Sequence, residues 1–153
     1  MGRDPGRNAP DASFEAPMTA FVDTNVLIRH LTGDPPAQAA QATKYLAEAD
    51  ELILTDLILA ETAYVLESLY HAPRAQVAET LRAVLGFRAI TVVDAELVQR
   101  AVEVYDIDRL DFADAYLVAC AERSGVGVIA SFDRSIDRVR TVRRVSATWA
   151  RGA

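Results

Sequence analysis

The chain has little of several residue types on which particular classes of protein depend. With one cysteine among 153 residues, Cys120, it cannot form an internal disulfide and has no cysteine cluster for a structural zinc site. Its two histidines, His30 and His71, lie near expected helix ends, which argues against a histidine pair acting as general acid and base. No apolar run approaches the roughly 20 residues that cross a bilayer, and the N-terminus lacks the apolar core of a secretory signal. We therefore expect a cytoplasmic protein without a membrane segment.

Lysine is almost absent, since Lys44 is the only one. The net charge of -6 argues against a protein that coats nucleic acid through a general basic surface. Six arginines nevertheless lie between Arg134 and Arg151. Because arginine binds phosphate in a bidentate manner, this segment is compatible with a local basic rim beside an acidic centre. A solvated surface that keeps the protein soluble explains the same arginines equally well.

The apolar pattern divides the chain into an N-terminal extension and one domain. Residues 1–17 hold three of the six prolines and few large apolar groups, which predicts a disordered extension. Residues 18–153 are long enough for a single domain with a sheet and flanking helices. The expected strands cover 20–22, 52–54, 90–93, 126–130 and 142–145. The expected helices cover 25–31, 36–49, 55–70, 73–85, 94–105, 111–124 and 135–139. This alternation favours an α/β fold with a mostly parallel sheet of about five strands.

Four acidic residues occupy positions that such a sheet would bring to one edge. Asp23 ends the first strand, and Asp133 follows the strand at 126–130; ligands of open parallel sheets bind at that edge. Asp114 lies in the first turn of its helix, where the helix dipole and free amides stabilise a carboxylate. Glu61 reaches the same edge only if its helix crosses the mouth of the sheet. Crowded carboxylates repel one another unless a cation neutralises them, and oxygen ligands suit Mg²⁺ or Mn²⁺.

Each of these acids also has a purely structural interpretation. Asp23 and Asp133 stand where an aspartate could cap a following helix. Asp111 occupies an expected N-cap position, and its spacing to Asp114 is that of a capping box, so we interpret Asp111 as structural and Asp114 as functional. Glu61 lies in an apolar stretch of helix, where an unpaired buried carboxylate is costly. That cost favours a functional role for Glu61.

Four short strings resemble the PIN-domain family, and more closely the VapC-type toxin ribonucleases of VapBC toxin-antitoxin systems. They are F-V-D-T-N-V-L-I at 21–28, A-E at 60–61, L-D-F-A-D-A-Y-L at 110–117 and S-F-D-R at 131–134. The strings occur in family order within residues 18–145. The resemblance implies a three-layer α/β/α fold built on a mostly parallel sheet.

The resemblance also implies a metal centre and a reaction. The residues that would line a Mg²⁺ site, with Mn²⁺ as a substitute, are Asp23, Glu61, Asp114 and Asp133, with Asn25 and Ser131 as polar support. The implied activity is hydrolysis of RNA by metal-activated water, which leaves 5′-phosphate and 3′-hydroxyl ends. A homodimer and a cognate antitoxin protein are the implied partners. Many family members carry a further acid two places after the last aspartate, where this chain has Ser135, so a second metal ion stays an open question.

Two other functional classes compete with this interpretation. An aspartate at the end of a first parallel strand also occurs in phospho-aspartyl enzymes. A metal-dependent phosphatase would need a second aspartate two places after Asp23, but Asn25 stands there. A phospho-aspartyl receiver domain would need a lysine at the end of a strand, but Lys44 lies in an expected helix. The stronger alternative is a non-catalytic PIN-like interaction module, whose acidic cleft receives a basic segment of a partner.

Overall fold

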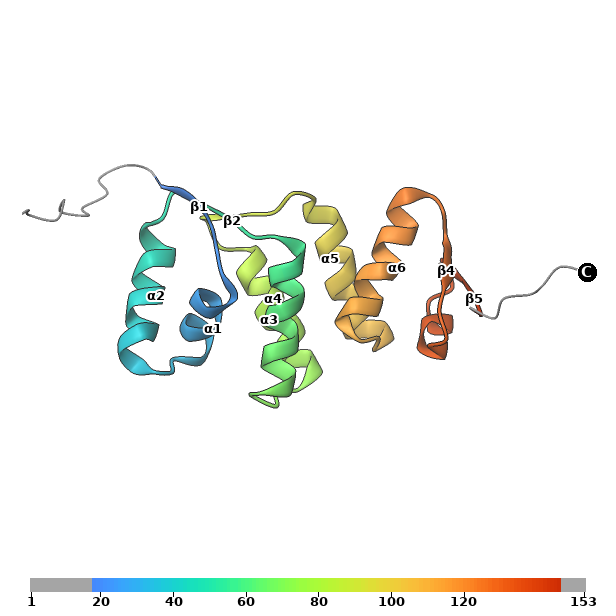
Figure 1. Cartoon of the computed structure of the whole chain (residues 1–153), viewed down its shortest axis with the longest axis horizontal. Helices are drawn as coiled ribbons and strands as arrows, with labels where there is room; N and C mark the ends of the chain where they lie inside the picture. The colour runs from blue at the N-terminus through green and yellow to red at the C-terminus, as the bar shows by residue number, and fades with distance from the viewer. Residues whose placement is uncertain (1–17, 147–153) are drawn as a thin grey trace, which may run out of the picture.

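Helices and parallel strands alternate along the chain, as the sequence predicts, and the architecture is α/β (Figure 1). The computed structural model describes residues 18–146; residues 1–17, where we expect a disordered extension, and residues 147–153 lie outside this part. The strands are β1 (Thr19–Phe21), β2 (Glu51–Ile53), β3 (Ile90–Thr91), β4 (Val128–Ala130) and β5 (Arg143–Val145). The helices are α1 (Thr24–Thr32), α2 (Pro36–Glu48), α3 (Asp56–Ser68), α4 (Arg74–Leu85), α5 (Ala95–Glu103) and α6 (Phe112–Ser124), with a π-helical turn η1 (Val104–Asp108) and a 3₁₀ turn η2 (Arg134–Arg138).

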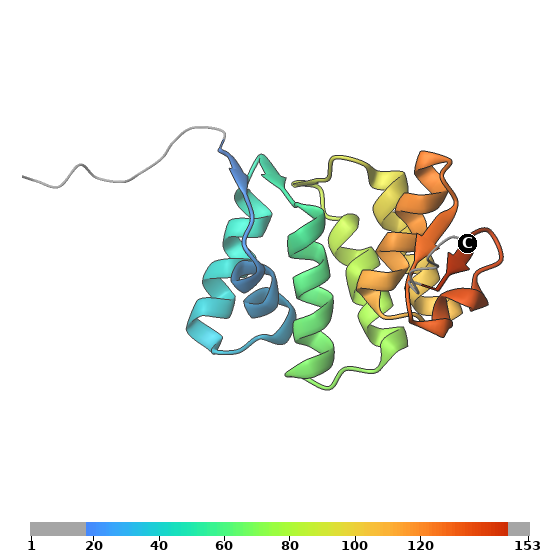
Figure 2. The ribbon, with the colours of Figure 1, turned by 45° about the vertical axis from the view of Figure 1, so that its right-hand side comes forward.

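The five strands form two parallel sheets, and the prediction of a single sheet of about five strands is wrong. One sheet has the order β1-β2-β3, and the other pairs β4 with β5. In Figures 1 and 2, helices α5 and α6 lie between the two sheets. The apolar pattern identifies a strand but does not choose its neighbour, because strand pairing depends on tertiary context.

Local hydrogen-bonding chemistry sets several helix starts as expected. The Thr55 hydroxyl caps α3 by accepting from the Ile58 amide at 3.3 Å, and the Asp94 carboxylate caps α5 by accepting from the Leu97 amide at 3.1 Å. Asp111 does occupy the N-cap position of α6, but its side chain makes no capping hydrogen bond. The capping-box interpretation of Asp111 is therefore not supported.

Two element boundaries differ from the expected ones for identifiable reasons. The strand expected from residue 126 begins at Val128, because Gly125 and Gly127 adopt φ values of 76° and 66° that are incompatible with a strand. The helix expected to end near residue 105 continues into η1. There the Arg74 guanidinium donates to the carbonyl oxygens of Tyr105 and Leu110 at 2.7 and 2.6 Å, which gives these carbonyls partners where the helix ends.

One cluster of buried apolar side chains includes residues from both sheets. Leu52 of β2, Leu81 of α4 and Val118 of α6 are fully buried in it, and Ile129 and Ile136 extend it to the β4–β5 region. The two sheets are therefore separate in hydrogen bonding but share one core. Within the described residues, none of the helices has the length and apolar character needed to span a membrane.

Candidate active site

A threonine next to the first acid binds the second. Asp23 is the N-cap residue of α1, yet its exposed carboxylate makes no capping hydrogen bond. The next residue, Thr24, is only 5% exposed, and its hydroxyl donates to Glu61 Oε2 across 2.6 Å. The hydrogen bond joins the first turn of α1 to the middle of α3. Asp23 directly precedes Thr24 in the chain, and we call Asp23 and Glu61 the N-terminal pair.

Glu61 is exposed, which corrects the expectation that it lies buried on an apolar helix face. The helix α3 carries apolar side chains around more than one face: Leu59 and Ala63 are buried, whereas Leu57 and Tyr64 are largely exposed. A carboxylate on this helix can therefore reach solvent. The cost of burying a carboxylate therefore no longer argues for a functional Glu61. The argument for its function now rests on the hydrogen bond from Thr24.

The other two acids form a second group, the C-terminal pair. Asp114 lies in the first turn of α6, and Asp133 lies three residues beyond the end of β4, as the N-cap residue of η2. Their carboxyl groups lie close enough together for each to shift the pKa of the other. Asp133 Oδ1 also accepts from the Ser135 amide at 2.8 Å, so the capping interpretation of Asp133 is confirmed alongside its proximity to Asp114.

The surroundings of the C-terminal pair shift the two carboxyl groups in opposite directions. Partial burial raises the pKa of Asp114, and the neighbouring Asp133 and the charge of Asp111 raise it further. The pKa of Asp133 is lowered, because its carboxylate accepts the Ser135 amide hydrogen bond and lies near the positive charge of Arg138. A proton shared by this pair therefore belongs to Asp114. A cation placed there would relieve the same crowding.

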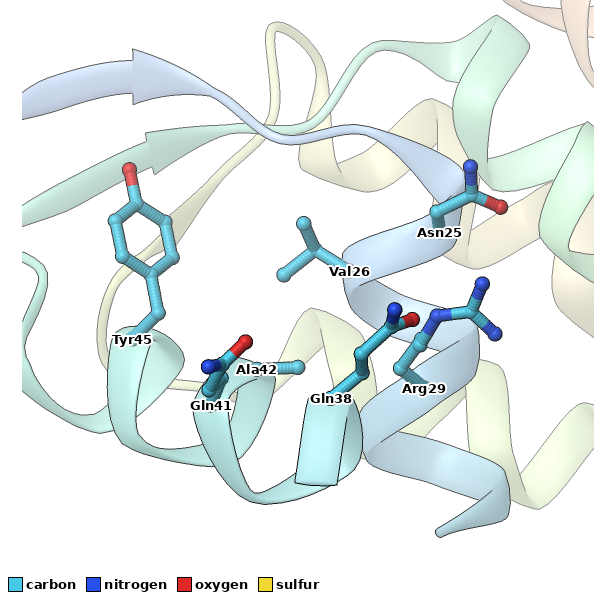
Figure 3. A pocket seen from close by; sticks show the side chains of 7 residues that line it. All are labelled: Asn25, Val26, Arg29, Gln38, Gln41, Ala42 and Tyr45. Atoms are coloured by element: carbon cyan, nitrogen blue, oxygen red, sulfur yellow. The ribbon is translucent and has the colours of Figure 1, made fainter. Parts of the chain in front are cut away.

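The two residues expected to give polar support behave differently. The Ser131 hydroxyl accepts from the Asp133 amide at 3.0 Å, so Ser131 fixes the backbone that carries the last acid. Asn25 lines a pocket of about 280 Å³ between α1 and α2. Figure 3 shows this pocket, whose other lining residues are Val26, Arg29, Gln38, Gln41, Ala42 and Tyr45. None of the four acids lines it, and the supporting role of Asn25 stays a prediction.

Several residues near the acids were not identified from the sequence. Thr24 lies inside the first motif, between Asp23 and Asn25. Its position next to an acid is the sequence signal that could have identified it as a site residue. Tyr116, in the same motif as Asp114, donates its hydroxyl to Asp56 Oδ2 at 2.5 Å and so ties α6 to the start of α3. No local pattern predicts that contact, because its partners lie 60 positions apart.

The structure does not bring the four acids into one cluster. Within residues 18–146, no three histidine, cysteine, aspartate or glutamate side chains are close enough to one another to hold a metal ion. Asp23 follows β1, and Glu61 lies in α3, which follows β2 of the same sheet. Asp133 follows β4, which belongs to the other sheet, and Asp114 lies in the first turn of α6.

The donor chemistry of both pairs nevertheless suits a hard divalent cation. All four side chains offer carboxylate oxygens, the ligands preferred by Mg²⁺ and Mn²⁺. The raised pKa of Asp114 marks a place where negative charge is crowded and partly shielded from water. The carboxylate of Asp23 is exposed and not used in capping its helix. The donor chemistry of the residues therefore fits such an ion, although within residues 18–146 the two pairs are not gathered around one position.

Comparison with known proteins bears on both the family and the fold. The PIN domain family matches residues 20–142, a range that contains all four acids. Among solved structures, a similar one is the crystal structure of VapC20 from Mycobacterium tuberculosis, a toxin that cleaves the sarcin-ricin loop. The similarity covers 77% of this chain and 92% of that chain, with 23% sequence identity and a TM-score of 0.38. Comparison with curated proteins gave no significant match.

Proposed function

The chain belongs to the PIN domain family, and we propose that it is a Mg²⁺- or Mn²⁺-dependent endoribonuclease. The observation that carries the proposal is the family match over residues 20–142, which includes the acids of both pairs in family order. The closeness of Asp114 and Asp133 supports it, because two carboxyl groups held together beside solvent form a natural cation site. Asp23, Glu61, Asp114 and Asp133 are the proposed metal-binding and catalytic residues.

A bound divalent ion would supply two things at this site: a lower pKa for the attacking water and neutralisation of charge on the phosphate. The protein's own residues do the positioning. Thr24 orients Glu61 by its 2.6 Å hydrogen bond, and the Ser135 amide orients Asp133. Polar groups of this kind behind metal-binding side chains typically account for about 10–100-fold in metal affinity or activity.

Arginines beside the C-terminal pair provide a means of holding RNA. Arg138 and Arg144 both lie near Asp133. The positive charge of Arg138 acts on the Asp133 carboxylate, and the negative charge of Asp133 acts on the Arg144 guanidinium. Arg144 is already paired with Asp137 at 3.0 Å, whereas Arg138 donates to a backbone carbonyl and keeps its charge toward solvent. We infer that Arg138 contacts a substrate phosphate. This is the basic rim that the arginine-rich segment suggested.

The biological setting follows from the motif resemblance. We propose that the protein is the toxin of a type II toxin-antitoxin system and acts on RNA in the cytoplasm. Its partner would be a cognate antitoxin, and its own assembly a homodimer. A cation from the antitoxin, such as an arginine, would suit the carboxylates of Asp114 and Asp133 and compete with the metal.

The separation of the two acidic pairs favours one alternative function, a non-catalytic interaction module. A non-catalytic PIN-like interaction module would not need the four acids in a single cluster, and none is present among residues 18–146. Such a module would bind a basic partner segment without cleaving RNA.

The test is cleavage of a mixed-sequence RNA labelled at its 5′ end, in Mg²⁺, in Mn²⁺ and in EDTA. The expected result is metal-dependent cleavage that Asp114→Asn reduces by at least about 100-fold, the lower end of what a positioned catalytic group contributes. New termini should be 5′-phosphates. Glu79→Gln, which removes an exposed carboxylate from α4, is the matched control and should leave cleavage unchanged.

Calorimetric titration with Mn²⁺ separates the nuclease from the interaction module. Saturable binding that Asp114→Asn weakens, together with RNA cleavage, supports the nuclease. The absence of metal-dependent cleavage on any RNA tested, with a folded protein by circular dichroism, would refute it and favour the module.

A further inference from the structure

The pocket between α1 and α2 begins close in the chain to Asp23, although none of the four acids lines it. We propose that this pocket holds one unpaired base of the RNA substrate, next to the phosphate that is cleaved. The proposal rests on the proposed function for the reaction at the acids, but the binding of the base is argued from the pocket itself. It assigns a role in substrate specificity to residues of α2, a helix that none of the four sequence motifs includes.

Helical spacing places the lining side chains on facing sides of the two helices. In α1, Asn25 and Arg29 are four positions apart. In α2, Gln38, Gln41 and Tyr45 are separated by three and four positions. Residues three or four apart lie on one face of a helix, so each helix presents a row of polar or aromatic side chains to the pocket. Both rows lie on regular secondary structure, which fixes their positions relative to a bound group.

The lining side chains match the parts of a nucleobase. In Figure 3, the polar groups of Arg29 and Gln38 lie at one end of the pocket, and the ring of Tyr45 stands at the other end. The small apolar side chains of Val26 and Ala42 lie between them. A base has a flat face that stacks on aromatic rings or guanidinium planes, and an edge of donors and acceptors that an amide side chain can bind.

Size and charge favour a base over a segment of a partner protein. A bound helix or strand needs a groove with several anchor positions, whereas a volume of about 280 Å³ suits one small group. Arg29 is the charged residue of the lining, and it donates to the Asp34 carbonyl oxygen over a long distance of 3.4 Å. Arg29 forms no ion pair within residues 18–146. Its guanidinium can therefore bind the phosphate attached to the base.

The position of the pocket relates base binding to cleavage. Asp23 directly precedes α1, and Asn25 lines the pocket from the first turn of the same helix. Unpaired RNA can turn a base away from the strand and into a protein pocket. A base held between α1 and α2 would keep its own phosphate near the start of α1, where Asp23 lies. The pocket would then select the nucleotide at which the chain cuts.

The first experiment locates the base without any cleavage. A single-stranded RNA that contains photoreactive thiouridine is irradiated with the protein in EDTA, and mass spectrometry identifies the crosslinked residues. Crosslinks are expected within residues 25–45, and Tyr45→Ala should lower their yield by at least about 5-fold, because stacking on an aromatic ring contributes strongly to the binding of a base. Tyr70→Ala is the matched control, since Tyr70 is 42% exposed, close to the 36% of Tyr45, and lies outside the pocket.

The second experiment measures the base contact during cleavage. The substrate is an RNA with one mapped cleavage site, compared with the same RNA in which the base beside that site is removed. For the wild type, loss of the base should lower kcat/KM by at least about 5-fold, as expected for a stacked and hydrogen-bonded base. In a protein with Gln38→Ala and Gln41→Ala together, the two RNAs should differ by less than about 2-fold. These changes keep the net charge, so general attraction to RNA is unaffected.

Gln99→Ala, which removes an exposed glutamine of α5 outside the pocket, is the control for the second experiment and should keep the wild-type ratio. Crosslinks that avoid residues 25–45, or equal cleavage of the two RNAs by the wild type, would overturn the base pocket while leaving the nuclease intact. Crosslinks at the pocket without cleavage would instead refute the proposed function and keep the base site. If Tyr45→Ala weakens binding of a partner protein but not the crosslinks, the pocket belongs to that partner and the proposal is wrong.

Discussion

The two acidic pairs are held in contrasting ways, although both fit the same kind of cation. In the N-terminal pair, a buried hydroxyl donates to Glu61, and Asp23 is exposed without a capping bond. In the C-terminal pair, two carboxyl groups lie close to each other, and burial with mutual repulsion raises the pKa of Asp114. Arg138 adds positive charge beside the C-terminal pair.

This contrast suggests that the two acidic pairs have different roles. The C-terminal pair concentrates negative charge next to arginine, which is suited to taking a cation and a phosphate together. The N-terminal pair offers ligands whose orientation is set by a neutral hydrogen bond. The following expectations test that difference, beginning with the core that both regions share.

The largest effect on stability is expected from shortening a buried side chain of either sheet in the common core. Leu52→Ala in β2 and Ile129→Ala in β4 should each lower the free energy of unfolding by about 2–5 kcal/mol, as for other buried aliphatic residues. Because one apolar cluster joins both sheets, each variant should show a single urea unfolding transition by circular dichroism. Leu57→Ala, at a side chain that is 76% exposed, should change stability by less than about 0.5 kcal/mol. Two separate transitions would show that the sheets unfold independently.

The next effect concerns the contact that holds the C-terminal region to α5. Glu122→Gln weakens a charged, two-bond contact with Arg100 and should cost about 1–2 kcal/mol at pH 7. Glu103→Gln is the matched control, since Glu103 meets the same arginine but is 51% exposed, and its loss should cost less than about 0.5 kcal/mol. Equal losses for both variants would contradict the special role of Glu122.

The Glu122 contact also predicts a dependence on pH. The hydrogen bonds of Arg100 lower the pKa of Glu122 below its ordinary value. A lowered pKa in the folded state stabilises the protein fully above the unfolded pKa of about 4.3, and this stabilisation is lost as the pH falls through the lowered value. The stability difference between wild type and Glu122→Gln should therefore be constant near pH 7 and shrink below about pH 4. Urea titrations at several pH values measure it.

A smaller effect is expected in the N-terminal pair, on activity more than on stability. Thr24→Val keeps the side-chain shape but removes the hydroxyl that orients Glu61, and should lower RNA cleavage by about 10-fold. Thr24→Ser should restore most of the rate. Thr32→Val is the control, because the Thr32 hydroxyl binds a backbone carbonyl within α1 and does not contact an acid. If the Thr24→Val protein kept full activity, the orientation of Glu61 by the Thr24 hydroxyl would not contribute to cleavage.

The smallest effect is expected at the arginine beside the C-terminal pair. Arg138→Ala should raise the KM for RNA by a few-fold with little change in kcat, and should reduce the salt slope of RNA binding by about one. Arg82→Ala, which removes an arginine paired with Asp106 on another face, should leave KM unchanged. A fall in kcat without a change in KM would place Arg138 in a different role.

The sequence alone was sufficient for several helix starts and strands that local interactions decide, although the capping box at Asp111 did not form. Thr55 and Asp94 cap their helices as expected, because the donor and acceptor lie three positions apart. The apolar runs located all five strands to within a few residues. The exposure of Glu61 was not predictable in this way, since α3 is apolar on several faces and its neighbours decide which face is covered.

The sequence by itself determined where helices and strands form, which acids the chain offers and the family to which it belongs. Periodicity, capping and motif order are properties of neighbouring residues, and they are readable along the chain. The tertiary structure decided that β1 and β4 lie in different sheets, that Thr24 binds Glu61 and that Asp114 lies close to Asp133. The physical reason is that backbone hydrogen bonds form equally well between any two strands. The choice among them is therefore made by packing between distant segments, such as the contact of Tyr116 with Asp56.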